Sequence, residues 1–393
     1  MYSSSHIVKI VTPYTEIAGV SDNGEILVNK YKAFKRFYPI RVGFTLCLCF
    51  IIVACSGDST LDNTKDDPIQ ITKSVSKMIE RLEICIDPRI ELINVVENAK
   101  SFKEKQLREP TMQQETSNYF LVYKNHPAIE MMQKLKTTGF TYTKPRLFIL
   151  GYTNPPELKL LYPLKQTYPY NDWIPDEGKL AEFTQKLKDF YNDTKFGTFY
   201  HKHQADYERL LGVVSADFEK RDYIKLLEDY FGEKKDRYVF IYSPTSPGGF
   251  GGWIKTEGKT TAYSIMFSGY VPLVLHEFGH DFVNPVIDEF KEEINLYQNL
   301  LSPILRDLPS CYDNWLTVVN EHIIRAFTVR VTIMLDGEEA GKRILDSEVS
   351  NGFKYIIPIY ERLKEYEVNR DKYPNFRSFF PRIIELFAEL SSK

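Results

Sequence analysis

The stretch Val274-Leu-His276-Glu277-Phe-Gly-His280-Asp-Phe-Val-Asn284 lies in an apolar run that begins near Val271. On a helix, residues four apart lie one turn above each other on the same face, so the imidazoles of His276 and His280 can bind one metal ion. Glu277 can then act as the base for the water that the metal activates. The alternative is a helix with two hydrogen-bonded histidines and a surface glutamate, but the Val, Leu and Phe flanks favour a buried metal-binding helix.

A catalytic zinc site needs a third protein ligand and an open fourth position. Metzincins place a Gly three residues and a His six residues after the second His of the motif. This chain has Val283 and Val286 at those positions, which excludes that class. Gluzincins instead take a Glu from a later helix. The downstream acidic candidates are Asp288, Glu289, Glu292, Glu293 and Glu321.

Glu321 is the candidate that the pattern favours. It is the only acidic residue between Asn314 and Met334, in a segment rich in apolar and β-branched residues. A buried carboxylate without a partner would be costly, and a metal would account for it. The competing interpretation is a buried ion pair with Arg325 at i, i+4 spacing. The other four candidates lie on a charged helix face that is typical of solvent exposure.

We therefore expect one Zn²⁺ ion per chain, held by His276, His280 and Glu321, with Glu277 as the catalytic base. Two neighbours of Glu321 are further candidates. Arg325 lies one turn beyond it and could orient it or stabilise an oxyanion. His322 could line the edge of the cleft, although a packed histidine is the simpler interpretation.

The N-terminal part predicts a lipoprotein leader. A basic run, 32–41, precedes an apolar run, 42–54, that is too short to span a bilayer but typical of a signal peptide. Ala54 directly before Cys55 resembles the lipobox of bacterial lipoproteins, in which the Cys carries the lipid. Met1 lies far upstream of the basic run, so we expect 1–54 to be a leader with an over-extended start. The lipidated Cys55 and a polar tether occupy 55–68; the alternative for the apolar run is a short buried element.

The rest of the chain predicts two parts. Residues 69–236 are expected to form a mainly helical subdomain, and its first helix is suggested by the spacing of Val75, Met78, Ile79 and Leu82. A second helix is expected to begin at Asp87-Pro88, a cap followed by Pro at the first helical position. Further helices are expected at 116–123, 128–136, 179–191 and, as a pair, within 199–230.

Residues 237–393 are expected to form the catalytic core. Two β-type runs, 238–242 and 261–267, flank a glycine-rich turn at 248–252, which we expect to be a hairpin or a loop at the rim of the cleft. Asn284-Pro285 should end the motif helix and start another that reaches about Leu300. Asp313 or Asn314 should cap the helix that carries Glu321, and two or three helices should follow within 338–390.

Strands that lead by a turn into a metal-binding helix follow the order that zincin folds use. The sequence therefore predicts an α+β fold, with a zincin-like metallopeptidase core and the helical subdomain as the other wall of the cleft. In such folds an edge strand beside the cleft can pair with the backbone of a peptide or protein substrate.

Composition limits the other partners. The chain has 43% hydrophobic and 26% charged residues, which is ordinary for a globular protein, and a net charge of −3. The absence of a basic field argues against nucleic acid. The glycine-rich turn lacks the Lys and Ser/Thr of a phosphate loop, which argues against a nucleotide. Whether Cys85 and Cys311 pair cannot be decided from the sequence.

Four motifs together resemble one family. They are Asp-Pro-Arg-Ile-Glu-Leu at 87–92, His-Glu-Phe-Gly-His…Asn-Pro at 276–285, Asn-Glu-His-Ile-Ile-Arg-Ala at 320–326 and Tyr-Glu-Val-Asn-Arg-Asp-Lys-Tyr-Pro at 366–374. With the lipoprotein leader, they resemble a domain-of-unknown-function family of Gram-negative lipoproteins regarded as gluzincin-like zinc metallopeptidases. The resemblance covers about 80–390.

The resemblance implies that His276, His280 and Glu321 match the ligand positions and that Glu277 matches the general base. It also implies a lipid anchor at Cys55 and a place in the bacterial cell envelope, at the outer membrane or cell surface. It implies no particular substrate. Two alternatives stay open: a surface-binding lipoprotein that holds zinc without turnover, and a hydrolase of non-peptide amides such as those of the cell wall.

Overall fold

A mixed five-stranded sheet forms the centre of the fold. The computed structural model describes residues 74–100, 110–167, 176–309 and 312–392, which all belong to one compact unit. The strand order is β1-β2-β3-β5-β4, with β2, β3 and β5 parallel and both edge strands antiparallel to their neighbours. The strands are β1 (Val75–Ile79), β2 (Leu82–Ile86), β3 (Arg237–Tyr242), β4 (Phe250–Thr256) and β5 (Lys259–Met266). The expected leader, Cys55 and the tether lie outside the described residues.

The start of the described chain is a β-hairpin, so the helix predicted there is wrong. The turn between β1 and β2 includes Glu80, whose φ of 51° lies in the left-handed region. Leu82, Ile84 and Ile86 alternate along β2 and are fully buried, whereas Met78 is 61% exposed. Pairing of β2 with β3, far along the chain, decides this conformation, and the local helical spacing does not reveal it.

Helices fill the long connection between β2 and β3, as the sequence predicts. Asp87 caps the first of them through the backbone N–H of Arg89, with Pro88 at the first helical position. The region 196–231 contains three helices where two were expected. The helices are α1 (Pro88–Asn98), α2 (Pro110–Phe120), η3 (Leu121–Tyr123), α3 (Pro127–Lys136), α4 (Thr143–Leu150), α5 (Leu164–Thr167), α6 (Glu177–Asp193), α7 (Phe196–Lys202), α8 (Gln204–Phe218) and α9 (Tyr223–Phe231).

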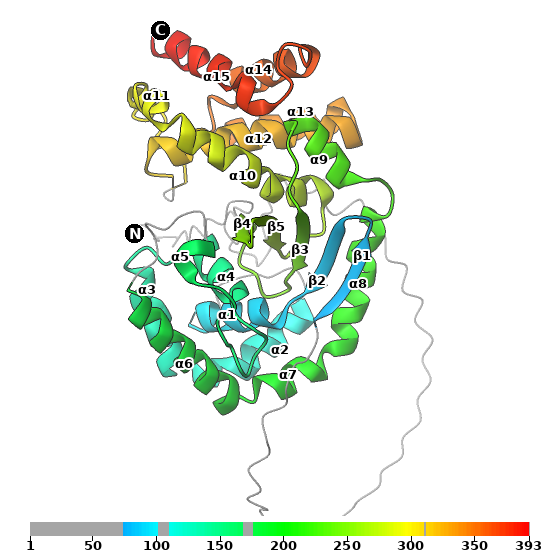
Figure 1. Cartoon of the computed structure of the whole chain (residues 1–393), viewed down its shortest axis with the longest axis vertical. Coiled ribbons are helices and arrows are strands. Elements are labelled where there is room, and N and C mark those ends of the chain that lie inside the picture. Colours follow the sequence, from blue (N-terminus) through cyan, green and yellow to red (C-terminus); the bar gives the residue numbers. More distant parts are fainter. Residues whose placement is uncertain (1–73, 101–109, 168–175, 310–311, 393) are drawn as a thin grey trace, which may run out of the picture. The chain divides into compact units, whose positions relative to one another are not determined.

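The boundary expected at residue 237 does not divide the core. Strands β1 and β2 precede it and strands β3 to β5 follow it, yet all five belong to one sheet. The helices after β5 form layers beyond the sheet, where α10 and α12 lie between it and α14 and α15 (Figure 1). They are α10 (Val271–Glu289), α11 (Lys291–Asn295), η5 (Gln298–Leu300), α12 (Trp315–Asp336), α13 (Glu338–Ser350), α14 (Ile356–Val368) and α15 (Phe376–Ser391). The fold is therefore α+β, as predicted.

Helix α10 continues through Pro285, contrary to the prediction that Asn284-Pro285 ends it. Proline removes one helical hydrogen bond, here to the carbonyl of Asp281, at a cost of roughly 3 kcal/mol. Packing of α10 against both the sheet and α12 outweighs that cost. Asn284 is consequently not a cap, and its side chain accepts a hydrogen bond from Nδ2 of Asn320 at 2.6 Å.

Strand β4 was missed, because its glycines were assigned to a turn. Successive residues of a strand face opposite sides of the sheet. A Cβ at Gly251 would meet the backbone of Glu277 on α10, whereas one at Gly252 would meet Thr143 and Leu147 on α4. Helices α10 and α4 thus cover opposite faces of this edge strand.

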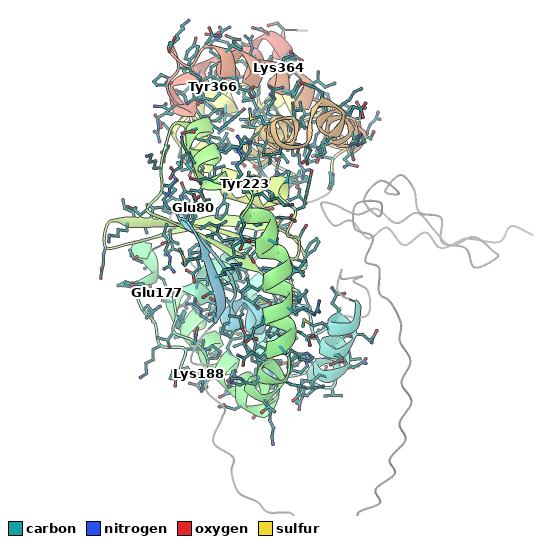
Figure 2. The ribbon with its side chains drawn as sticks, turned by 90° about the vertical axis from the view of Figure 1, so that its right-hand side faces the viewer. Glu80, Glu177, Lys188, Tyr223, Lys364 and Tyr366 are labelled. Atoms are coloured by element: carbon teal, nitrogen blue, oxygen red, sulfur yellow. The ribbon has the colours of Figure 1, made fainter. Side chains whose placement is uncertain are left out.

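Helix α9 is bound by the C-terminal helices. The backbone carbonyl of Tyr230 accepts hydrogen bonds from the hydroxyl of Tyr366 (2.7 Å) and from Arg370 (2.6 Å). Glu367 pairs with Arg330 of α12 and accepts from the hydroxyl of Tyr230. Figure 2 shows Tyr366 among the C-terminal helices and Tyr223, at the start of α9, at their junction with the sheet. The motif at 366–374 therefore stabilises this junction.

Within the described ranges, none of the helices combines the length and the hydropathy that crossing a bilayer requires.

A buried carboxylate links α1 to the end of β3. Glu91 is 2% exposed and accepts hydrogen bonds from the hydroxyls of Ser243 and Thr245. Burial raises the pKa of Glu91 to about 7, although both hydrogen bonds favour the charged form and oppose this rise. The carboxyl group of Glu91 therefore binds its proton more tightly in the folded protein than in the unfolded chain.

We predict that Glu91 makes the protein less stable as the pH rises. A raised folded-state pKa gives stability that is complete below the unfolded pKa near 4.5 and is lost as the pH rises through about 7. The loss amounts to about 3 kcal/mol by this linkage. Urea unfolding of the wild type and Glu91→Gln from pH 4.5 to 8 measures it, and Glu91→Gln should lack this slope. Parallel curves for the two proteins would contradict the prediction.

Candidate metal centre

Helices α10 and α12 bring three potential metal ligands together. One ligand atom from each of His276, His280 and Glu321 lies within 4.8 Å of the other two. The imidazole rings of the two histidines are 5.2 Å apart between centroids, as i, i+4 spacing on α10 requires. Nε2 of His280 lies 3.8 Å from Oε1 of Glu321. The structure therefore confirms that these predicted residues converge, and the group is close enough to bind a metal ion.

The environment of His276 fixes which of its nitrogens carries the proton. Its Nδ1 lies 2.8 Å from the hydroxyl of Thr328, and that hydroxyl already donates to the carbonyl of Ile324 at 2.8 Å. A hydroxyl has one proton to donate, so Nδ1 of His276 must be the donor in the first contact. The lone pair is then on Nε2, the arrangement usual for a metal-binding histidine.

His280 is oriented in the same way by an amide. Its Nδ1 lies 2.9 Å from Oδ1 of Asn320, an oxygen that can only accept. Asn320 is itself held by the bond from its Nδ2 to Asn284. Both histidines thus have Nδ1–H bound and Nε2 as the lone-pair nitrogen. Sequence reasoning assigned no role to Asn320 or Thr328, although both lie near Glu321 along one helix.

Arg325 contacts Glu321. The two interpretations of Glu321, an ion pair with Arg325 and a metal ligand, are therefore compatible, because each uses a different carboxylate oxygen. Nε of Arg325 is 3.2 Å from Oε2 of Glu321, while Oε1 is directed toward His280. The guanidinium is 2% exposed and also binds Glu348 at 2.7 Å and the hydroxyl of Tyr312 at 3.2 Å. Arg325 therefore orients the carboxylate of Glu321, the third potential ligand. Glu348 lies on α13, and no sequence pattern links it to the metal-binding motif.

His322 lies outside the ligand group. It is 1% exposed, its Nδ1 is 2.7 Å from the carbonyl of Val318, and its ring packs on Phe353 and Tyr355. Burial lowers the pKa of His322 to about 4. It is a packed, neutral histidine, as the simpler interpretation held. The four other acidic candidates, Asp288, Glu289, Glu292 and Glu293, are exposed, as predicted.

Glu277 lies beside the ligands and against β4. Burial and the charge of Glu321 raise the pKa of Glu277 well above its usual value. Arg325 and a hydrogen bond from the backbone of Gly251 oppose this rise. Burial, together with His280 and Arg325, keeps the pKa of His276 well below its usual value. His276 is therefore neutral near pH 7, the state that binds metals.

The donor set restricts the kind of metal. Two imidazole nitrogens and one carboxylate oxygen suit zinc and other borderline transition metals better than Ca²⁺ or Mg²⁺, which prefer oxygen ligands. Three protein ligands leave a position open, as catalytic sites require.

We predict that the hydroxyl of Thr328 raises the affinity for metal. Thr328→Val removes the acceptor for Nδ1–H of His276 with little change in shape, and such orienting contacts are worth roughly 10–100-fold in affinity. Competition with a chromophoric chelator measures the change.

Thr332→Val is the matched control. Thr332 lies one turn further along α12, is also buried and donates to the carbonyl of Thr328 instead. Equal weakening by both substitutions, or none by Thr328→Val, would refute the role of this hydroxyl.

Comparison with known proteins identifies a family. A family model described as "Domain of unknown function (DUF4932)" matches residues 82–386, which include all the residues of the candidate centre. Neither a curated protein nor a solved structure matches the chain.

Proposed function

Since the chain belongs to the DUF4932 family, we propose from its metal centre that it is a zinc-dependent hydrolase, a gluzincin-type metallopeptidase that cleaves amide bonds. One observation carries this proposal. His276, His280 and Glu321 converge, and each is oriented by its own contact: His276 donates to Thr328, His280 donates to Asn320, and Glu321 pairs with Arg325. Structural zinc sites usually have four protein ligands, so a set of three favours catalysis.

The arrangement around the centre supports a zincin-like core. The motif helix α10 follows β5 directly and packs on β4, the antiparallel strand at one edge of the sheet. An extended peptide can add to such an edge through backbone hydrogen bonds, which favours a peptide or protein as the substrate.

Bound zinc would polarise the scissile carbonyl and lower the pKa of the attacking water. His276, His280 and Glu321 would hold it. Glu277, next to the first ligand, accepts the proton of the attacking water and passes it to the leaving nitrogen. Because Glu277 is 4% exposed and lies against Gly249 and Gly251, bulk water has little access to the proton that it accepts.

The proposal includes a cellular location, which is inferred from the sequence. The signal-peptide pattern before Cys55 supports a lipid anchor and a location in the bacterial cell envelope, with the catalytic unit held by the tether at 55–68. Metabolic labelling with a fatty-acid analogue would test this, since Cys55→Ser should abolish incorporation.

We predict that Glu277→Gln keeps the metal and loses hydrolysis. The amide has the same shape but cannot accept the proton, and general base catalysis is typically worth 10²–10⁴-fold in rate. Metal content by mass spectrometry and cleavage of a mixed peptide library measure the two properties. Glu289→Gln, an exposed position on the same helix, should change neither.

Two results would overturn parts of this proposal. A Glu277→Gln protein as active as the wild type would exclude the mechanism. Wild-type protein that binds one zinc ion but cleaves no library member would favour the two alternatives, a binding lipoprotein or a hydrolase of non-peptide amides. Release of products from cell-wall fragments would then distinguish these two.

A further inference from the structure

The segment that joins β3 to β4 is bound at its start by one face of α1. Glu91 accepts hydrogen bonds from the hydroxyls of Ser243 and Thr245, the latter at 2.8 Å. Asn94 donates to the hydroxyl of Ser243 at 2.9 Å, and Asn98 donates to the carbonyl of Thr245 at 3.2 Å. Positions 91, 94 and 98 recur at helical spacing, so one side of α1 makes all four contacts. All five residues are buried.

The other end of the same segment lies against Glu277. A Cβ at Gly249 would lie 2.1 Å from Oε1 of Glu277 and 2.9 Å from Cε of Met266. A Cβ at Gly251 would lie 2.0 Å from the backbone oxygen of Glu277. Neither glycine has a positive φ, so lack of space and not backbone conformation requires glycine here. Gly251 also provides the backbone hydrogen bond to the Glu277 carboxylate.

Only three residues, 246–248, separate the two ends of the segment, and hydrogen bonds of Ser246 connect these residues to both sides. The N–H of Ser246 bonds the carbonyl of Ser243 at 3.1 Å, and its hydroxyl bonds the carbonyl of Gly248 at 2.9 Å. A second connection runs beside them. The fully buried Arg146 donates to Oδ1 of Asn94 at 2.8 Å and stacks over the ring of Phe250 at 3.9 Å. A displacement at α1 would therefore be transmitted to the glycines.

We infer that Glu91 is a positioning residue for Glu277. Through Ser243 and Thr245 it holds the start of the β3–β4 segment, and the segment in turn sets where Gly249 and Gly251 contact the Glu277 carboxylate. The expected effect on catalysis rests on the proposed function. The expected effect on the position of the β3–β4 segment does not depend on it. Loss of the Glu91 contacts removes two of the four hydrogen bonds that hold the start of the segment, and it changes none of the three potential metal ligands.

The experiment compares Glu91→Ala with the wild-type full chain. Hydrogen–deuterium exchange of the peptide that covers 246–252 should become at least tenfold faster. The zinc content should stay the same, and kcat should fall roughly 10–100-fold because the base is no longer held in place. Glu91→Gln keeps the volume and one acceptor oxygen, so it should restore most of the protection and of kcat.

Glu228→Ala is the matched control. Glu228 is also a buried carboxylate, 4% exposed, and it accepts from the hydroxyl of Tyr238 and from Arg81. Among the described residues its partners are Arg81, between β1 and β2, and Tyr238 on β3, and neither belongs to the β3–β4 segment. Glu228→Ala should therefore destabilise the fold without changing exchange at 246–252 selectively. If Glu91→Ala does not fold, Thr245→Val removes one of the same hydrogen bonds and should give a smaller change, of about threefold, in the same direction.

Failure of the positioning role and failure of the proposed function give different results. Unchanged exchange in Glu91→Ala, or equal changes in Glu228→Ala, would overturn the positioning role. Faster exchange with unchanged kcat would also overturn it, because the segment would then not orient the base. If the wild type hydrolyses no substrate, the proposed function fails. Faster exchange in Glu91→Ala alone, with zinc retained, would still support the structural link.

Discussion

Close packing of α10 against α12 is the constraint on which the metal centre depends. A Cβ at Gly279 would lie 3.2 Å from Cδ1 of Ile324 and 3.3 Å from the ring of Phe327, so these α12 side chains would have to shift by a few tenths of an ångström to admit even alanine. Gly279 lies between the two histidines of α10, where the helices must approach for imidazoles and carboxylate to share one ion. Gly279 thus allows the close approach of α10 and α12 that brings the imidazoles and the carboxylate together.

Two of the four motifs that carry the family resemblance lie outside the metal centre and connect elements of the fold. In the first, Asp87 caps α1, Arg89 binds the carbonyls of Leu150 and Tyr152, and Glu91 binds the segment after β3. The motif at 366–374 binds the end of α9 to the C-terminal helices. These two motifs hold the sheet and the α12 layer in place. The candidate centre needs both, because Glu277, the proposed base, contacts β4 and Glu321 lies on α12.

Much of the metal centre could be predicted from sequence, because its signals are local. Helical spacing on α10 and a lone acid on an apolar helix predict the three potential ligands that the structure brings together. The pair of Arg325 with Glu321 could also be predicted, because both residues lie on one helix at i, i+4 spacing. The contacts of Thr328, Asn320 and Glu348 could not, because they depend on how separate helices pack. The same limit explains the errors in the fold. The hairpin β1–β2 depends on pairing with β3, and Pro285 stays helical because α10 is packed on two sides.

The charges around Arg325 explain how the centre can keep its shape with and without a metal. A buried guanidinium needs a partner, and Arg325 has two carboxylates, Glu321 and Glu348. A metal that draws negative charge from Glu321 leaves Arg325 still paired with Glu348, whereas the carboxylate of Glu321 remains held by Arg325 when no metal is bound. Glu321 would thus not have to be ordered when a metal binds, which would save the conformational entropy that a mobile glutamate loses. Glu348 would therefore contribute to metal affinity without contacting the metal.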